Sequence, residues 1–375
     1  MVILNQVKQI TAIIIAIALS ACATSQSQEQ KINANHDKIT VMGRTVTTEQ
    51  GTVMFSYPGV TFSMNVKAKA LTAKLNSSQG NSYIDITIDD GQPRAIKVSQ
   101  QAQEITLFSS PEVVQHQVVI QHRSESWHGT TTLHNFTLTD GELLTAPLLP
   151  NKKILFIGDS ITCGDAIDRD IPLTKGQCNK SNAWWNAKQT FGMLLSDKLN
   201  AQAQLVCYGG KGVVRTWQGK TDELNAEDFY QFAIPAFQYK SELTSQADKY
   251  RWQQENYQAD LAVIVLGTND FSGAAGPFPE QAYFVNRYRR LIDQIRTEHP
   301  DIKIALSDGP MLSGAAKKTL RRYLSDIVTH YNNDDVVLLL AEHNPGDSCD
   351  YHPNRDKHQL IADDFYQPLK KLMNW

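Results

Sequence analysis

The chain has 375 residues, of which 41% are hydrophobic and 20% charged, and its formal net charge at pH 7 is -3. This composition is typical of a folded globular protein rather than a disordered chain, and the length suggests two domains. The sequence has no basic stripe or polybasic tail, which argues against a nucleic-acid partner. No apolar run beyond the N-terminus is long enough to span a bilayer.

Residues 1–22 have the pattern of a secretory signal peptide. A positive charge precedes an apolar run from Ile10 to Leu19, and the segment ends in Leu-Ser-Ala-Cys at Cys22. That ending resembles the bacterial lipobox, whose cysteine is lipidated and becomes the new N-terminus; the alternative is a plain signal peptide in which Cys22 is incidental. We therefore expect an exported lipoprotein of the cell envelope. Ala23 favours sorting to the outer membrane, and the polar residues 23–36 are expected to form a flexible tether.

Residues 37–149 show a period of two and few helical signals. Roughly eight short β-rich runs are separated by turn residues such as Asp89-Asp90-Gly91. This pattern predicts a β-sandwich, of the jelly-roll kind. Trp127 and Tyr57 are candidates for a sugar-binding face, although a buried position is the commoner fate of such aromatic residues. Prolines at both ends of 147–150 mark the domain boundary.

From residue 150 to the C-terminus, apolar strands alternate with amphipathic helices, which predicts an α/β domain with a parallel sheet between two helical layers. The polar stretch 216–256 does not fit this alternation and is expected to be an insertion that frames the cleft. The expected strands are 153–158, 204–208, 261–266, 303–307 and 336–340. The expected helices are 183–199, 280–297, 315–331 and 357–373.

Three short motifs follow predicted strands at the same edge of this sheet. Gly158-Asp159-Ser160 ends the first strand, where open α/β sheets bind their ligands, so Ser160 is a candidate nucleophile. Tyr208-Gly209-Gly210 ends the second, and its glycines allow a backbone N–H to approach an oxyanion closely. Gly267-Thr268-Asn269-Asp270 ends the third, and the Asn269 amide can donate a further hydrogen bond. Each motif alone has an alternative interpretation as a turn or a helix cap, and a serine after aspartate is more often part of a helix N-cap.

A fourth motif, Cys349-Asp350-Tyr351-His352-Pro353, precedes the last predicted helix. From there a histidine can reach a serine at the end of the first strand and act as general base and then acid. The four motifs together, in this order, resemble those of the SGNH (GDSL-type) hydrolases. The resemblance implies a flavodoxin-like fold and ester hydrolysis without a metal or cofactor. It assigns Ser160 as nucleophile, His352 as base, and Gly210, Asn269 and the Ser160 N–H as the oxyanion hole.

The resemblance is closest to carbohydrate esterase family two. Gly158 to Gly164, Gly210-Lys211-Gly212 and Cys349 to His358 are similar to motifs of that family, which pairs this catalytic domain with an N-terminal β-sandwich. The segment His122-Arg123-Ser124-Glu125, late in the predicted sandwich, also matches. Members of the family remove acetyl groups from sugars, typically from acetylated xylan or related plant polysaccharides.

The sequence leaves open the role of Asp350 and the choice of general base. The superfamily carries Asp three positions before the histidine, where this chain has Cys349, so Asp350 either completes a triad or is absent from a Ser-His dyad. The resemblance implies that Tyr351 lies near the sugar, and we predict Asp270 as a second substrate-binding residue. His358 is the competing general base, although the motif favours His352.

The remaining cysteines are Cys163, Cys178, Cys207 and Cys349. Cys163 and Cys178 flank one loop after the candidate nucleophile, and an oxidising compartment permits a disulfide there, whereas Cys207 lies in an apolar strand and is expected to be a buried thiol. The spacing of His343, Cys349 and His358 matches no common metal site.

The sequence thus predicts a membrane-tethered serine esterase that removes O-acetyl groups from carbohydrate. Two alternatives remain: a lipase, thioesterase or peptidoglycan O-acetylesterase of the same superfamily, and a surface glycan-binding lipoprotein with an idle hydrolase domain. No obligate protein partner is indicated.

Overall fold

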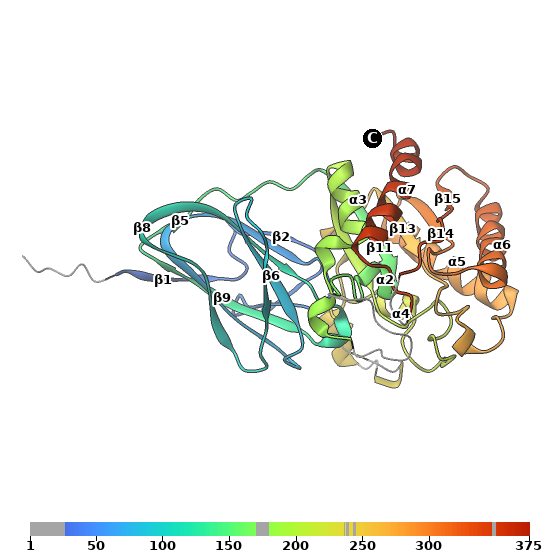
Figure 1. The fold of residues 1–375 in the computed structure, drawn as a ribbon, viewed down its shortest axis with the longest axis horizontal. Helices are drawn as coiled ribbons and strands as arrows, with labels where there is room; N and C mark the ends of the chain where they lie inside the picture. Colours follow the sequence, from blue (N-terminus) through green and yellow to red (C-terminus); the bar gives the residue numbers. More distant parts are fainter. Residues whose placement is uncertain (1–26, 170–179, 236, 238–239, 243–244, 347–349) are drawn as a thin grey trace, which may run out of the picture.

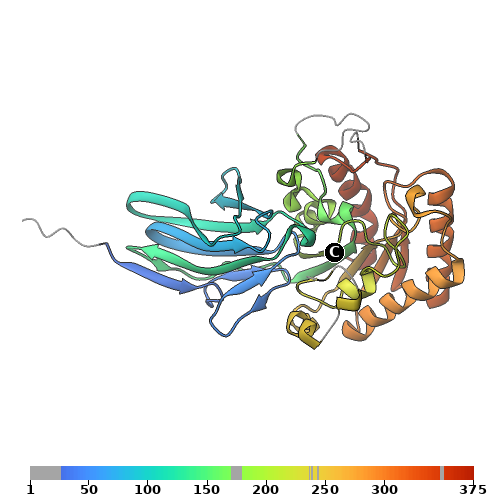
Figure 2. The same ribbon diagram turned by 90° about the horizontal axis from the view of Figure 1, so that it is seen from below.

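The computed structural model describes residues 27–169, 180–235, 237, 240–242, 245–346 and 350–375. The predicted signal peptide, the lipidation site Cys22, Cys178 and Cys349 lie outside these residues. Figures 1 and 2 show the antiparallel sheet domain at one end of an elongated molecule and the α/β domain at the other. Within the described ranges, no helix has the length and apolar character needed to cross a membrane.

The N-terminal domain is a ten-stranded antiparallel sheet with the order β3-β4-β9-β5-β8-β6-β7; β1 joins β9, while β2 and β10 join β5. Strands β5 and β8 are much longer than the short runs that the sequence predicted. Register shifts near Ala68 and Leu71 interrupt the alternation of apolar and polar residues without ending the pairing of β5 with β8. The strands are β1 (Glu29–Asn33), β2 (Thr40–Met42), β3 (Val46–Thr47), β4 (Val53–Phe55), β5 (Thr61–Ser77), β6 (Tyr83–Ile88), β7 (Arg94–Lys97), β8 (Gln103–His122), β9 (Thr131–Thr139) and β10 (Glu142–Leu143).

The prediction of a flexible tether over residues 23–36 is wrong for part of that segment. Residues Glu29–Asn33 form β1, which pairs with β9 in register from Glu29 opposite Thr139 to Asn33 opposite Asn135. Ile32 is buried in the domain core. The polar composition of this strand reflects its position at the edge of the sheet, where most side chains face water.

The α/β domain contains a five-stranded parallel sheet with the order β12-β11-β13-β14-β15. This is the flavodoxin-like order, in which the direction of winding reverses beside the first strand and leaves a crevice at its carboxyl end. The predicted fold class is therefore confirmed. The strands are β11 (Lys152–Gly158), β12 (Ala201–Cys207), β13 (Leu261–Val265), β14 (Lys303–Ser307) and β15 (Val336–Leu339).

Helices cover both faces of this sheet (Figure 1). α3 (Phe191–Leu199) packs with α7 (Arg355–Met373) on one face, and α5 (Gln281–Glu298) packs with α6 (Gly314–Tyr331) on the other. The helix expected over 183–199 is correct only for its second half. Two 3-10 turns, Asn182–Trp184 and Ala187–Gln189, precede α3, which begins where Thr190 caps it by accepting from the Met193 N–H.

The two domains share a continuous hydrophobic core rather than a loose contact. Arg44 is fully buried at the seam and donates to the carbonyls of Tyr230 and Phe232. Tyr57, predicted as a candidate sugar-binding residue, is 1% exposed, and its hydroxyl donates to Phe229 O at 2.7 Å. Tyr57 is therefore a residue of the domain interface and not of a binding face.

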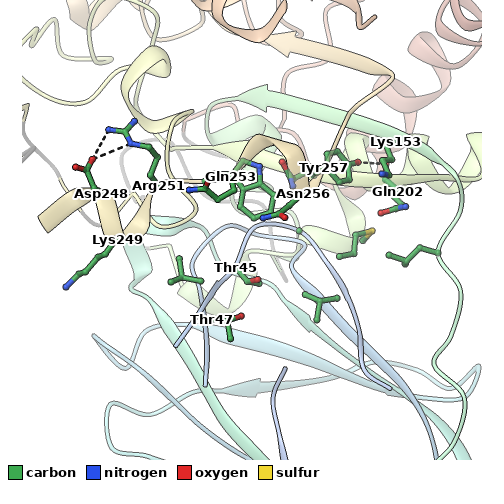
Figure 3. Close-up of a pocket in the computed structure, with 17 residues that line it drawn as sticks. Thr45, Thr47, Lys153, Gln202, Asp248, Lys249, Arg251, Gln253, Asn256 and Tyr257 are labelled. Carbon is green, nitrogen blue, oxygen red and sulfur yellow. Dashed lines mark hydrogen bonds and ion pairs between the residues drawn. The ribbon is translucent and has the colours of Figure 1, made fainter. Parts of the chain in front are cut away.

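A cavity of about 610 Å³ lies at this seam, beside the starts of β11 and β12 (Figure 3). Thr45 and Thr47 border it from the N-terminal domain, and Gln202, Arg251 and Tyr257 are among the residues that border it from the α/β domain. The predicted insertion 216–256 supplies part of that wall. The carboxyl ends of the strands, where the sequence motifs lie, are at the opposite end of the parallel sheet.

Candidate active site

Ser160 lies at the start of the short helix α2 (Ser160–Cys163), directly after β11. Asp159 caps this helix by accepting from the Ile161 N–H at 3.0 Å. A Cβ at Gly158 would lie 2.0 Å from Thr162 Oγ1, so only glycine permits the chain to turn this tightly from strand into helix. Ser160 is 8% exposed and lines a cavity at the switch point of the sheet.

His352 reaches Ser160 from the loop that precedes α7. Its Nε2 lies 2.7 Å from Ser160 Oγ, the geometry of a nucleophile and its general base. The loop is tightly built: Tyr351 has a positive φ of 61°, and a Cβ at Gly346 would meet the His352 carbonyl at 1.7 Å. Arg169 donates to that same carbonyl at 3.0 Å, so the backbone of the histidine is held from two sides.

Asp350 contacts the other ring nitrogen of His352, with Oδ2 3.0 Å from Nδ1. The serine, histidine and carboxylate thus stand in line, in the geometry of a triad rather than a dyad. Lys180 pairs with Asp350 and also with Asp165, whose Oδ2 lies 2.7 Å from Nζ. Asp165 Oδ2 lies 3.4 Å from His352 Nε2. Neither Asp165 nor Lys180 was singled out by sequence.

This charge arrangement decides the protonation of the site. Burial alone would lower the pKa of His352, but the charge of Asp165 and the hydrogen bond that the ring donates to Asp350 outweigh it, and the pKa lies above its ordinary value. Burial works in the opposite sense on Asp350, yet its bond to His352 and the Lys180 charge hold the pKa of its carboxyl well below the usual range. Asp350 is therefore ionised throughout the pH range in which His352 titrates.

His358, the competing base, is fully buried on the inner side of α7. Its Nδ1 accepts from the Phe191 N–H at 3.1 Å, and burial lowers its pKa to about 3. A neutral, enclosed imidazole has a structural role here. Among the described residues, only Asp165, Asp350 and His352 bring three metal-ligating atoms within 4.8 Å of one another, and the ammonium of Lys180 forms an ion pair with each of the two carboxylates.

Three potential oxyanion donors border the same cavity. The backbone N–H groups of Ser160 and Gly210 donate to no acceptor among the described residues. Asn269 Nδ2 donates to Lys211 O at 2.8 Å and to Asp159 Oδ2 at 3.3 Å, so donation to a bound oxyanion would replace the longer contact. The residues expected to form the oxyanion hole are therefore brought together, two of them with unused donors.

Asp270 is buried and does not line the cavity, which contradicts the prediction that it binds substrate. Its side chain is fully buried, and its two carboxylate oxygens accept from the backbone N–H groups of Val213, Val214 and Arg215 at 2.8–3.2 Å. The carboxylate fixes the loop that follows Gly210. Tyr351, by contrast, is 54% exposed at the edge of the cavity, where an aromatic ring is available to a ligand.

The cavity measures about 900 Å³ and draws residues from both domains. Glu125 and Trp127 come from the N-terminal domain, and Trp127 and Trp217 remain 37% and 47% exposed at its border. Of the two aromatic residues proposed for a sugar-binding face, Trp127 thus lies at the candidate site. The resemblance over 122–125 was the only sequence signal for Glu125, because two of its three partners, Trp185 and Gly209, lie on segments remote in sequence.

The predicted disulfide is wrong in one partner. Cys163 is bonded to Cys207, with their Cα atoms 5.6 Å apart, so it is not available to Cys178 and Cys207 is not a free thiol. The reason is the strand order: β11 and β12 are neighbours, and Cys207 lies opposite Gly158 in the register. The bond ties the helix that carries Ser160 to the strand that leads into Gly210.

Comparison with known proteins assigns the family. Residues 41–147 match Carbohydrate esterase 2 N-terminal, and residues 154–365 match GDSL-like Lipase/Acylhydrolase. A Cellvibrio japonicus (strain Ueda107) protein named acetylxylan esterase / glucomannan deacetylase is 41% identical over 360 residues, 95% of this chain and 96% of that protein. The chain belongs to carbohydrate esterase family two. It is a carboxylic ester hydrolase, as the motifs predicted.

Solved structures of this family share both domains. A family two carbohydrate esterase from Cellvibrio japonicus superimposes with a TM-score of 0.86 at 41% identity, covering 93% of this chain and 99% of that one. A family two esterase from Clostridium thermocellum in complex with cellohexaose gives a TM-score of 0.79 at 25% identity, covering 90% of this chain and 99% of that one. The predicted pairing of a β-rich domain with an SGNH hydrolase domain is therefore confirmed.

Proposed function

We propose that this esterase removes O-acetyl groups from xylan or a related polysaccharide by a serine acyl-enzyme mechanism. The observation that carries the proposal is the line of Ser160, His352 and Asp350 beside the unused N–H groups of Ser160 and Gly210. The similarity to an acetylxylan esterase / glucomannan deacetylase supports the substrate class. The aromatic border formed by Trp127, Trp217 and Tyr351 supports a sugar ligand, since flat rings present apolar faces to it.

In the proposed reaction Ser160 Oγ attacks the acetyl carbonyl while His352 Nε2 takes its proton. The developing oxyanion receives hydrogen bonds from the N–H groups of Ser160 and Gly210 and from Asn269 Nδ2. His352 then returns the proton to the sugar oxygen, which leaves, and the acetyl group stays on Ser160. A water molecule attacks this acyl-enzyme by the same route and releases acetate. Asp350 orients the imidazole and stabilises its charged form.

The test measures acetate release from acetylated xylan and acetylated glucomannan by wild type and Ser160→Ala, with 4-nitrophenyl acetate as a small-ester control. We expect release from a polysaccharide and from the control, both abolished in the variant. Activity on the small ester alone would move the natural substrate elsewhere, for example to peptidoglycan acetyl groups, and a preference for long-chain esters would favour a lipase. Unchanged release by Ser160→Ala would refute the nucleophile, and an inactive wild type would favour a glycan-binding role.

We also propose that the protein is exported and anchored through a lipid on Cys22. The signal-like segment 1–22 and its lipobox-like ending support this, and the Cys163–Cys207 disulfide is the kind of bond that forms in oxidising compartments. Fractionation of cells expressing wild type and Cys22→Ala tests it. We expect wild type in the outer-membrane fraction and labelled by radioactive palmitate, and the variant in neither state. Soluble, unlabelled wild type would contradict the anchor.

A further inference from the structure

Glu125 is a carboxylate of the N-terminal domain that is buried inside the active-site wall, with 1% of its surface exposed. Three N–H donors converge on it. Oε1 accepts from the indoles of Trp127 and Trp185, the latter at 3.0 Å, and Oε2 accepts from the Gly209 N–H at 2.7 Å. Among the described residues no lysine or arginine forms an ion pair with it. A buried, unpaired carboxylate is costly, and only such converging donors compensate for the loss of water.

The contact with Gly209 is the one that bears on catalysis. Residues 208–211 form a tight turn in which the Lys211 N–H donates to Tyr208 O at 3.3 Å and Gly210 has a positive φ of 74°. A turn of this kind uses the N–H of neither central residue. Glu125 takes up the N–H of Gly209, the first of them, and the N–H of Gly210, the second, is left facing no acceptor among the described residues.

Gly209 is required by the closeness of this contact rather than by its backbone conformation. A Cβ added there would lie 2.8 Å from both carboxylate oxygens of Glu125, which is closer than real Cβ atoms approach. Glycine therefore lets the carboxylate sit directly on the turn. The N-terminal domain thus holds the turn of the catalytic domain that carries a predicted oxyanion donor.

We propose that Glu125 is a positioning residue that fixes the 208–211 turn so that the Gly210 N–H is presented to the oxyanion. The inference rests on the proposed serine esterase function. Glu125 acts through Gly209 and does not touch the reacting atoms. Its role explains why a β-rich domain accompanies the hydrolase domain: the catalytic geometry is completed from across the domain boundary.

Glutamine is the sharpest substitution because it keeps the shape of the side chain. Its carbonyl oxygen can still accept, but its amide nitrogen would face an N–H donor, so at least one of the three hydrogen bonds is lost. Gly209→Ala makes the complementary change, since its Cβ displaces the carboxylate while leaving Glu125 itself intact. Tyr57→Phe is the matched control, because it removes a buried hydrogen bond across the same seam, to Phe229 O, and neither of these two residues lines the cavity.

The experiment measures kcat and KM of the full chain with 4-nitrophenyl acetate at a pH above 7, because burial raises the pKa of Glu125 to about 7 and the carboxyl is ionised only above it. Active sites are counted by stoichiometric reaction with an organophosphate. For Glu125→Gln and Gly209→Ala we expect kcat per counted site to fall about 10- to 100-fold, the range for a displaced catalytic donor, with KM close to wild type. Binding of a boronic acid that mimics the tetrahedral intermediate should weaken in proportion. Tyr57→Phe should lose stability but keep its kcat per counted site.

Unchanged kcat per counted site in either folded variant would overturn the proposal and leave Glu125 as a seam residue only. A fall in kcat that Tyr57→Phe reproduces would overturn it equally, since a loosened interface would then be the cause. Cooperative thermal unfolding establishes that each variant is folded, and Gly209→Ala carries the test if Glu125→Gln does not fold. Failure of the proposed function would instead appear as an inactive wild type.

Discussion

Removal of the Cys163–Cys207 disulfide should destabilise the hydrolase domain strongly. The bond closes a loop with a sequence separation of 44. The chain-entropy relation gives about 13 cal/mol/K for the entropy that the unfolded chain loses when such a loop is closed. The bond therefore destabilises the unfolded chain by about 4 kcal/mol at 25 °C. For a domain of ~150–250 residues each kcal/mol changes Tm by about 2–4 °C, so Cys163→Ala/Cys207→Ala should melt ~8–16 °C lower.

Differential scanning calorimetry of the oxidised wild type, the double variant and Cys178→Ala tests this reasoning. Reductant should lower the Tm of wild type and Cys178→Ala towards that of the double variant, and should leave the double variant unchanged. Because both cysteines are fully buried, reduction is expected only after partial unfolding. If Cys178→Ala melts like the double variant, or if peptide mapping finds Cys163 bonded to Cys178, the strand-register argument is refuted.

Three further predictions concern charge and substrate contacts. Asp350→Asn should lower kcat by up to about 10⁴-fold, the loss typical of a triad carboxylate. The pKa of His352 lies above its ordinary value and the neutral ring is the active form, so kcat/KM should fall as pH drops through that raised pKa. In pH–rate profiles, Asp350→Asn should shift this acidic decline in kcat/KM to lower pH. Trp217→Ala should raise KM for acetylated xylan about 2- to 10-fold through lost aromatic contact, without affecting 4-nitrophenyl acetate. Burial raises the pKa of Glu125 from 4.5 to about 7, so protonation of Glu125 favours the folded state by an amount that is fully present below pH 4.5 and is lost as pH rises through 7. Urea unfolding should therefore show wild type losing about 3 kcal/mol of stability relative to Glu125→Gln over that interval. An unchanged difference between the two proteins would contradict that pKa.

The strand-end motifs were predictable because parallel strands place their carboxyl ends at one edge of a sheet. Ser160, Gly210 and Asn269 follow β11, β12 and β13 respectively. The alternation of strands and helices in the sequence was therefore enough to predict that these three residues lie close together. The contact of Asp350 with His352 was not decidable in the same way. It depends on the left-handed backbone of Tyr351, which no local pattern indicates, since such a conformation in a non-glycine residue is imposed by the surrounding loop.

The errors share a physical cause, which is dependence on neighbours that are distant in sequence. Asp270 was predicted to bind substrate, whereas the loop 213–215 folds over its carboxylate and encloses it. The disulfide was paired within one loop because its true partner, Cys207, becomes a neighbour only through the order of the sheet. Lys180 and Asp165 likewise acquire meaning only from their contacts around His352.

The contacts between the two domains explain why the hydrolase domain should not be active when separated from the N-terminal domain. Separation would expose the core that Tyr57 and Phe229 share and would leave the carbonyl partners of Arg44 without their donor, both of which cost free energy. The same separation would withdraw Glu125 from Gly209. With Glu125 in its proposed role, stability and catalytic geometry both depend on this one interface. A β-rich domain that contributed only sugar affinity would need no buried contact with the 208–211 turn, which carries the Gly210 N–H.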